Sequence, residues 1–261
     1  MDTIVVIPAR YGSSRFPGKP LAPIAGRSLL ERVWKIATAV PGVDGVVVAT
    51  DDTRVAEHVT SFGGRFVMTS ESCRNGSERV WEAVSQLAQR PKNIINLQGD
   101  AVLMPPWVIG ALVQELSSDP SVVIATPATR LTTEQYTSMS KMKSSGVVSG
   151  TTVTFANNRD ALYFSKTIIP FVRSWSESGL SPIYQHIGVY AYRYESLKQY
   201  IDLPVGRLEQ VEQLEQLRAL EHGVPIRVVE VSLNGRTMWS VDNPEDVTRV
   251  EEIISLEGEL V

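Results

Sequence analysis

Short apolar runs rich in β-branched residues alternate with amphipathic helical patterns through the first half of the 261-residue chain. These patterns predict strands at residues 3–8, 45–50, 65–68, 93–97 and 122–126. Helices are predicted between them, at residues 28–40, 52–62, 76–89 and 106–116. Such alternation is typical of a sheet with parallel strands and with helices on both faces. We therefore expect an α/β fold in three layers, with a mixed and mostly parallel sheet that binds ligands beyond the carboxyl ends of its strands.

The second half of the chain has a less regular pattern. The polar segment 132–150 predicts a mobile loop, and apolar residues at helical spacing predict one helix over 206–222. Further strands are predicted at 152–155, 187–192, 226–231 and 238–241. Asn243 and Pro244 are typical of the N-cap and the first position of a final helix. The length suits a single domain, 1–261, which we divide into 1–130, 131–235 and 236–261.

The composition argues against several classes of protein. A net charge of −4 and a pI near 5.5 disfavour general binding to nucleic acids or to anionic membranes. Cys73 is the one cysteine in the sequence, so neither an intramolecular disulfide nor a structural zinc cluster is expected. No run approaches the roughly 18 consecutive apolar residues of a membrane-spanning helix, and the N-terminus has no secretory pattern. We therefore expect a soluble, cytoplasmic protein.

A loop rich in glycine, serine and cationic residues follows directly after the first predicted strand. Its cations are Arg10, Arg15 and Lys19. Glycines let a backbone approach a ligand closely, serines add hydrogen-bond donors, and cations match phosphate oxygens. An acidic protein that binds a polyanion has to gather its cations locally, as this loop does. The loop therefore predicts a cradle for an anion, and we expect that anion to be a nucleoside triphosphate.

This loop differs from an ordinary P-loop. A P-loop has the pattern Gly-x-x-x-x-Gly-Lys followed by Ser or Thr, whose hydroxyl group binds Mg²⁺. Here five residues separate Gly12 from Gly18, and Pro20 follows Lys19. Proline has neither a backbone N–H nor a hydroxyl group. The loop must therefore hold phosphate and metal in another way.

Two carboxylates stand at the ends of predicted strands. Asp100 follows the apolar run at 93–97 through Gln98 and Gly99, and Asp242 ends the strand predicted at 238–241. Two carboxylates that face a phosphate-binding loop suit Mg²⁺ held jointly by the protein and a triphosphate. From the residues alone, Asp242 could equally well be a helix-entry residue without a role in binding. Asp100 could be a turn residue, but the position of Asp100 at a strand end favours a functional role.

Six segments together resemble the CMP-Kdo synthetases, which are 3-deoxy-manno-octulosonate (Kdo) cytidylyltransferases. The segments lie at residues 7–21, 98–100, 161–165, 186–190, 214–218 and 241–246, in the family's order and spacing. Residues 10–24 and 203–223 are most similar to the branch that uses 8-amino-Kdo. The resemblance implies a Rossmann-like nucleotidyltransferase fold and a cytoplasmic homodimer. It also implies Mg²⁺-dependent transfer of CMP from CTP to Kdo or 8-amino-Kdo, with release of pyrophosphate, in lipopolysaccharide biosynthesis.

The resemblance further implies roles for particular residues. Lys19, Arg10 and Asp100 would be catalytic, while Asp100 and Asp242 would bind Mg²⁺. The residues that would bind CTP are Arg10, Ser13, Ser14, Arg15, Lys19 and Arg79. The residues that would bind the acceptor are Gln98, His186, Tyr190, Glu215 and Gln216. Residues 1–130 would bind CTP, 131–235 would bind the acceptor and form the dimer, and 236–261 would return a metal-ligating strand and a helix.

Three positions depart from the family's pattern. Ala101 stands where Glu or Gln is usual, Thr152 where a lysine is usual, and Lys166 where an arginine is usual. All three fall on the side that would bind the acceptor. Two alternatives therefore stay open. One is a cytidylyltransferase for another acid, such as a phosphonate of natural-product biosynthesis. The second is a CTP-binding protein without turnover. The two carboxylates argue against this second alternative.

Overall fold

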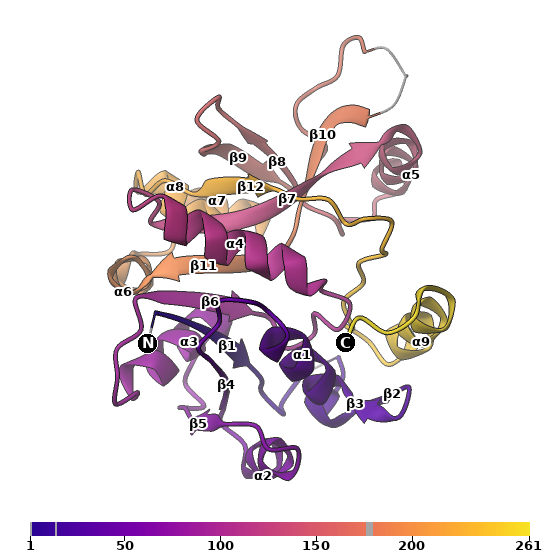
Figure 1. Cartoon of the computed structure of the whole chain (residues 1–261). Helices are drawn as coiled ribbons and strands as arrows, with labels where there is room; N and C mark the ends of the chain where they lie inside the picture. The colour runs from indigo at the N-terminus through magenta and orange to yellow at the C-terminus, as the bar shows by residue number, and fades with distance from the viewer. Residues whose placement is uncertain (1, 14, 176–179) are drawn as a thin grey trace.

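The structure is a computed structural model that describes residues 2–13, 15–175 and 180–261 (Figure 1). Its strands are β1 (Thr3–Pro8), β2 (Pro23–Ile24), β3 (Arg27–Ser28), β4 (Gly45–Thr50), β5 (Phe66–Met68), β6 (Asn93–Leu97), β7 (Ile124–Thr132), β8 (Thr152–Phe155), β9 (Ala161–Ser165), β10 (Leu180–His186), β11 (Val189–Arg193) and β12 (Arg227–Glu230). Its α-helices are α1 (Leu29–Thr38), α2 (Thr53–Ser61), α3 (Gly76–Ser85), α4 (Pro106–Ser118), α5 (Thr133–Ser144), α6 (Tyr194–Asp202), α7 (Arg207–Glu212), α8 (Leu217–Glu221) and α9 (Glu245–Glu257). None of the helices in the described ranges is both long and apolar enough to cross a membrane.

Ten strands of the described part of the chain form one mixed sheet, in the order β5-β4-β1-β6-β11-β7-β10-β8-β9, with β12 paired to β7. Strands β5, β4, β1 and β6 are parallel to one another, and Ile4 of β1 lies opposite Gly45 and Ile94. Strands β11, β10, β8 and β9 join through antiparallel pairs, whereas β12 runs parallel to β7. The expected mixed α/β sheet is confirmed, with a larger antiparallel share than the sequence pattern predicted.

Helices cover both faces of the sheet, which gives the expected three layers (Figure 1). Side chains of β1 alternate between the faces: Val5 and Ile7 join one core with α1 and α4, and Ile4 and Val6 join the other core with α3 and α6. All four side chains are fully buried. Burial of each such side chain contributes about 1.5–3 kcal/mol. An unbroken apolar strand is what a sheet covered on both faces requires.

Three expectations for the second half of the chain are wrong. Segment 132–150 contains α5, which a capping box begins: Thr132 accepts a hydrogen bond from Gln135 N, and the Gln135 side chain accepts one from Thr132 N. The helix expected over 206–222 is broken into α7 and α8, because Gln213 adopts a left-handed φ of 55°. Residues 238–241 form no strand in the described structure.

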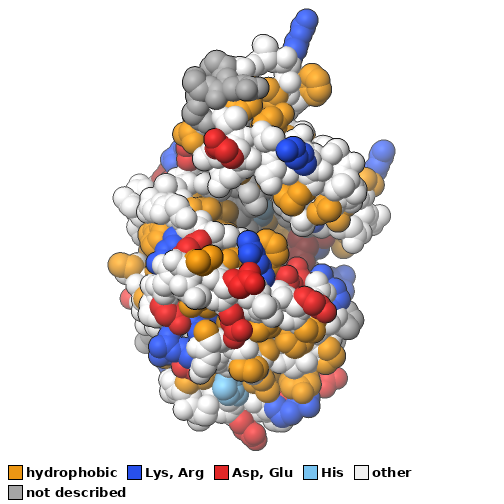
Figure 2. Space-filling view, turned by 90° about the vertical axis from the view of Figure 1, so that its right-hand side faces the viewer, with side chains coloured by type: hydrophobic (Ala, Val, Ile, Leu, Met, Phe, Trp, Pro, Cys, Tyr) orange, Lys and Arg blue, Asp and Glu red, His pale blue; other side chains and the backbone are white. Residues whose placement is uncertain are grey.

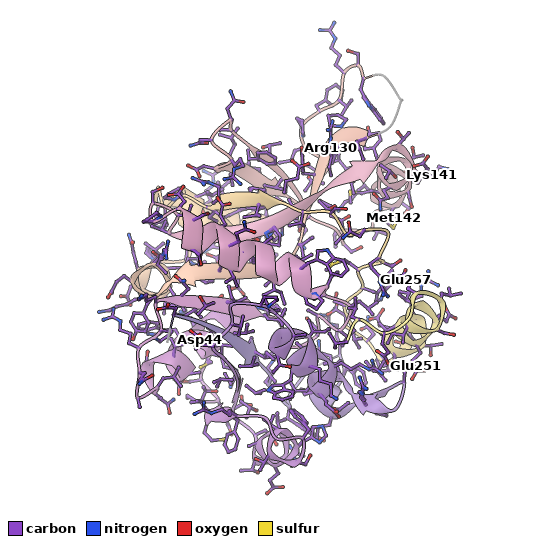
Figure 3. All side chains as sticks on the ribbon, viewed as in Figure 1. Asp44, Arg130, Lys141, Met142, Glu251 and Glu257 are labelled. Atoms are coloured by element: carbon purple, nitrogen blue, oxygen red, sulfur yellow. The ribbon has the colours of Figure 1, made fainter. Side chains whose placement is uncertain are left out.

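Helix α9 packs back onto the N-terminal half of the molecule. Its Glu251 (labelled in Figure 3) accepts a hydrogen bond from Ala25 N at 2.8 Å, in the turn between β2 and β3. Asn243 does not cap this helix with its side chain, contrary to expectation. Asp246 Oδ2 instead accepts hydrogen bonds from Asp242 N and Asn243 N, both at 2.8 Å. The segment before α9 is thereby fixed beside the loop that follows β1.

Candidate active site

A cavity of about 360 Å³ opens where β1 and β6 end. Figure 2 looks at the face toward which these two strands run in Figure 1, and it shows a recess between the two halves of the molecule. Nine of the predicted site residues line the cavity: Arg10, Ser13, Arg15, Lys19, Arg79, Gln98, Asp100, Glu215 and Asp242. Ser14 lies outside the described residues.

The first wall of the cavity is the cation loop, which we define as residues 10–19. The Tyr11 carbonyl oxygen accepts hydrogen bonds from Ser13 N and Gly18 N, both at 3.0 Å. Gly18 has a φ of 74°, a conformation that favours glycine. The guanidinium group of Arg54, in α2, lies 3.4 Å from the centre of the Tyr11 ring. The loop is therefore closed on itself and anchored to α2.

Two cations of this loop are paired with the two predicted metal ligands. Lys19 Nζ lies 2.8 Å from Asp100 Oδ2 and 2.9 Å from the Val241 carbonyl oxygen. Arg15 Nη2 lies 2.8 Å from Asp242 Oδ1. The Lys19 and Asp100 side chains are 17% and 28% exposed, against 62% and 42% for Arg15 and Asp242. Solvent therefore screens the second pair more than the first.

The two carboxylates suit a Mg²⁺ ion that is shared with a nucleotide. Mg²⁺ usually takes one or two carboxylates from a protein and completes its shell with substrate phosphates and water. Among the described residues, no group of three or more His, Cys, Asp or Glu side chains gathers as a metal site. Asp100 and Asp242 therefore fit a metal held together with a triphosphate, whereas a cage built by the protein alone does not fit.

A second wall comes from the first turn of α3. Asn75 Oδ1 accepts a hydrogen bond from Glu78 N at 2.9 Å and so caps the helix. Arg79 follows in the same turn, with Nη2 2.7 Å from Asp51 Oδ2 and Nη1 2.6 Å from Thr69 Oγ1. Arg79 lines the cavity but is only 3% exposed. Its ion pair with Asp51 fixes it in the wall.

Two of the five predicted acceptor-binding residues line the cavity. Gln98 follows β6 and donates from Nε2 to Asn96 Oδ1 at 3.0 Å. Glu215 comes from the turn between α7 and α8 and accepts a hydrogen bond from Ser77 Oγ at 3.3 Å. Solvent reaches Glu215 through the cavity, yet the surrounding protein partly desolvates its carboxyl group and raises its pKa. Gln98 and Glu215 offer hydrogen-bond partners to a polyol.

The structure does not place the remaining three, His186, Tyr190 and Gln216, among the described residues that line the cavity. Tyr190 lies opposite Asn96 in the register of β11 with β6, and its ring is 5.5 Å from that of His186. Desolvation lowers the pKa of His186 to about 3, so its ring is neutral at physiological pH. Gln216 is 7% exposed, and its Nε2 has no hydrogen-bond partner among the described residues. Tyr190 is thus paired with the residue that accepts the Gln98 hydrogen bond, and Gln216 follows Glu215 directly in the chain.

Sequence reasoning missed Cys73, Arg74 and Asn75, which also line the cavity. Their signal was the Asn75 cap directly before the helix that carries Arg79. Arg74 is paired with Glu78, and its side chain is 69% exposed. Desolvation raises the pKa of the Cys73 thiol to about 11. A protonated thiol is a poor nucleophile, so Cys73 offers no covalent chemistry here.

Comparison with known proteins identifies the family of the chain that forms this cavity. Residues 4–228 match the family model described as cytidylyltransferase. The chain is 55% identical over 261 residues to the 3-deoxy-manno-octulosonate cytidylyltransferase of Maricaulis maris (strain MCS10), with 100% of both chains covered. The chain belongs to the CMP-Kdo synthetase family of cytidylyltransferases. It is also 44% identical over 249 residues to the enzyme of the same name from Chlamydia trachomatis serovar L2, which covers 95% of this chain and 92% of that one.

The fold of this cytidylyltransferase also matches a solved structure. That structure is CMP:2-keto-3-deoxy-manno-octonic acid synthetase complexed with CTP. The two share 35% identity and a TM-score of 0.85, over 98% of this chain and 100% of that chain. The predicted family, the nucleotidyltransferase fold and the enzyme class are therefore confirmed.

The three positions of this cytidylyltransferase that depart from the family's pattern lie outside the described lining of the cavity. Thr152 is fully buried, and its hydroxyl donates to the Thr167 carbonyl oxygen at 2.7 Å and accepts from Ile169 N at 3.1 Å. Ala101 packs against the core, and Lys166 follows the end of β9. The Thr152 side chain is thus used within the buried structure, and none of the three positions contributes to the described lining of the cavity.

Proposed function

We propose that this cytidylyltransferase transfers CMP from CTP to a hydroxyl group of Kdo and releases pyrophosphate. The observation that carries this proposal is the 55% identity, over the full length of both chains, to a 3-deoxy-manno-octulosonate cytidylyltransferase. The cavity supports it, because cations for a triphosphate and polar groups for a polyol share one space. We further propose that the enzyme works in the cytoplasm, where CTP is available, and that it is a homodimer.

The cation loop would position the triphosphate. Transfer of a nucleotidyl group by in-line displacement depends on orientation and charge neutralisation, and it needs no covalent enzyme intermediate. Arg10 and Arg15 can each give a phosphate two parallel hydrogen bonds, and Lys19 adds a compact charge. Ser13, Ser14 and Arg79 would complete the CTP site. Stabilising charge on the leaving pyrophosphate is the main contribution that we assign to Arg10 and Lys19.

Asp100 and Asp242 would hold Mg²⁺ together with the triphosphate. When bound there, Mg²⁺ supplies charge screening at the phosphate and favours a deprotonated attacking hydroxyl group. Lys19 and Arg15 would then exchange their carboxylate partners for phosphate oxygens. The two ion pairs seen in this structure keep both carboxylates and both cations in place for that exchange.

Gln98 and Glu215 would orient the acceptor through hydrogen bonds with its hydroxyl groups. The Gln98 amide can donate or accept such bonds, and the Glu215 carboxylate can accept them. Gln216 does not line the cavity, but it follows Glu215 directly, and its buried Nε2 has no hydrogen-bond partner among the described residues, which supports a role beside Glu215. His186 and Tyr190 would contribute to the same site. Sequence similarity to the 8-amino-Kdo branch in residues 10–24 and 203–223 makes that sugar the second acceptor to test.

A pyrophosphate-release assay tests the proposal with CTP, Mg²⁺ and three acceptors in parallel: Kdo, 8-amino-Kdo and a small phosphonate. We expect release with Kdo, its loss in excess EDTA, and its recovery on adding Mg²⁺. Release with 8-amino-Kdo alone would assign the enzyme to the other branch, and release with the phosphonate alone would refute a sugar acceptor. If no acceptor releases pyrophosphate although CTP binds, a CTP-binding protein without turnover would be favoured.

Asp100→Asn is expected to abolish turnover while the fold stays intact. Sedimentation measurements test whether the enzyme is a dimer.

A further inference from the structure

The turn that carries Glu215 is held by a hydroxyl group outside the cavity. Tyr200, in α6, donates from its hydroxyl group to the Glu215 carbonyl oxygen at 2.9 Å. Tyr200 itself is 3% exposed. The bond holds the backbone of Glu215, whose side chain lines the cavity. Among the described residues, the Glu215 carboxylate accepts one weak hydrogen bond, from Ser77 Oγ at 3.3 Å.

The same turn needs such a restraint because its backbone is irregular. Gln213 adopts a left-handed φ of 55°, which separates α7 from α8. On the other side of Glu215, Arg218 donates to Glu209 from Nε at 2.7 Å and from Nη2 at 2.5 Å. The Arg218 guanidinium also lies 5.2 Å from the centre of the Tyr200 ring. Tyr200 therefore contacts the turn at Glu215 and at Arg218.

The Tyr200 ring is itself held in a buried row of aromatic rings. Its centre is 5.9 Å from that of Tyr192, which is 6.1 Å from that of Tyr190. The row continues through His186, 5.5 Å from Tyr190, to Phe164, 5.0 Å further on. Packed aromatic rings have few alternative rotamers. The hydroxyl group at the end of this row is thus presented to the turn at a fixed place.

We propose that the Tyr200 hydroxyl is a positioning group for the acceptor, which acts by fixing the Glu215 backbone so that its carboxylate meets a hydroxyl group of the sugar acid. This inference rests on the proposed function, since the role of Glu215 comes from there. It adds a residue of α6, outside the cavity, to the determinants of acceptor affinity. We expect a smaller effect on CTP binding, because the cation loop lies on a different wall.

Tyr200→Phe tests the inference, since it removes the hydroxyl group and keeps the ring. We expect the KM for the acceptor to rise about five- to tenfold, in line with the loss of one hydrogen bond, and the KM for CTP to change less than about twofold. Tyr184→Phe is the matched control, because it removes the 3.1 Å hydrogen bond from the Tyr184 hydroxyl to Glu230, away from the cavity. That control should leave both KM values unchanged.

A double-mutant cycle with Glu215→Gln separates positioning from a general loss of stability. If Tyr200 acts through Glu215, the double variant has the same acceptor KM as Glu215→Gln alone. Three results would each overturn the inference. The first is a double variant whose rise in acceptor KM is the product of the two single rises. The others are an unchanged acceptor KM in Tyr200→Phe and an equal rise in the KM values for acceptor and CTP. Wild-type turnover with Kdo alongside any of these results leaves the proposed function standing. A wild type that is silent with every acceptor would overturn both.

Discussion

At the scale of single residues, two cations of the cavity are already paired with carboxylates. Lys19 is bound to Asp100 and Arg15 to Asp242, so two cations of the cation loop each contact a proposed metal ligand. Such pairing keeps the walls ordered and their net charge low. It also means that the triphosphate has to compete with a carboxylate for each of these cations. Removal of a carboxylate therefore has opposite effects on metal-free and metal-dependent binding.

Asp242→Asn is expected to tighten CTP binding in EDTA by up to about fivefold, because an exposed ion pair of ~0.2–1 kcal/mol no longer competes for Arg15. In Mg²⁺ the same variant should lose most of its turnover. Isothermal titration of CTP in each buffer measures the first effect. Arg15→Gln is the matched control and should weaken CTP binding in both buffers. Weaker binding of CTP by Asp242→Asn in EDTA would contradict the exchange of partners.

His186 makes a second prediction at this scale. The folded ring has a pKa of about 3 against an ordinary 6.5, so between these values the unfolded chain binds a proton that the folded one does not. Stability is therefore complete above pH 6.5 and is lost as the pH falls, by at most ~1.4 kcal/mol per pH unit. Urea denaturation at several pH values from 7 to 4.5 gives the free energy of unfolding as a function of pH. This free energy should fall less steeply with falling pH in His186→Gln than in the wild type.

Arg10 and Asp100 were predictable from local patterns, because both follow the ends of apolar strands and the carboxyl ends of parallel strands meet at one edge of a sheet. Arg79 and Glu215 were predicted only through the family resemblance, and Arg74 was missed. The positions of His186 and Tyr190 were not predictable in this way. They depend on β11 pairing antiparallel with β6, and no local pattern encodes which strand becomes a neighbour.

At the scale of elements, β1 and β6 end in close backbone contact. A Cβ atom on Gly99 would lie 2.7 Å from the Pro8 carbonyl oxygen, so Gly99→Ala must push the two strand ends apart. Displacement of Asp100 by this shift is expected to lower kcat/KM about a hundredfold. Gly110→Ala in α4 is the control, because its Cβ would lie 4.0 Å from the nearest atom, Val40 Cγ1. Steady-state kinetics that show equal activity in the two variants would contradict the prediction.

The missed and broken helices have local explanations. The polar sequence of α5 gives little amphipathic signal, although Thr132 and Gln135 at capping-box spacing were a readable start. The break between α7 and α8 has no comparable signal. Apolar spacing continues through Gln213, whose left-handed backbone is held by the tertiary contacts around Glu215 and Arg218. Helical periodicity therefore predicted burial correctly for Leu214 and Leu217, whereas Leu208 and Val211 are exposed and the helix is not continuous.

At the scale of the whole molecule, a buried carboxylate joins α4 to β12 and to the loop between β8 and β9. Glu115 of α4 is 9% exposed, and its Oε1 lies 2.8 Å from both Arg227 Nη1 and Arg159 Nη2. Glu115→Gln leaves two guanidinium groups without their shared counter-charge. We expect the free energy of unfolding to fall by about 2 kcal/mol or more, as measured by urea denaturation. Glu252→Gln removes an exposed pair with Arg249 and should cost less than about 0.5 kcal/mol; equal losses would contradict this reading.

The parallel half of the sheet could be predicted from alternation alone, because each of its strands is followed by a helix. The other half could not, since β11 inserts between β6 and β7 and β12 returns to pair with β7. These pairings join segments that are far apart in sequence. Burial of shared apolar surface selects them only once the chain is compact.

The ion pair between Arg15 and Asp242 spans 227 positions of the sequence. On the ribosome, the parallel half of the sheet can therefore begin to fold long before residue 242 has been synthesised. The cation loop would spend that interval without its carboxylate partner from the later segment. Under the proposed function, a nascent chain arrested before that residue carries the cations of the loop without the second proposed metal ligand, so nucleotide capture would precede catalytic competence.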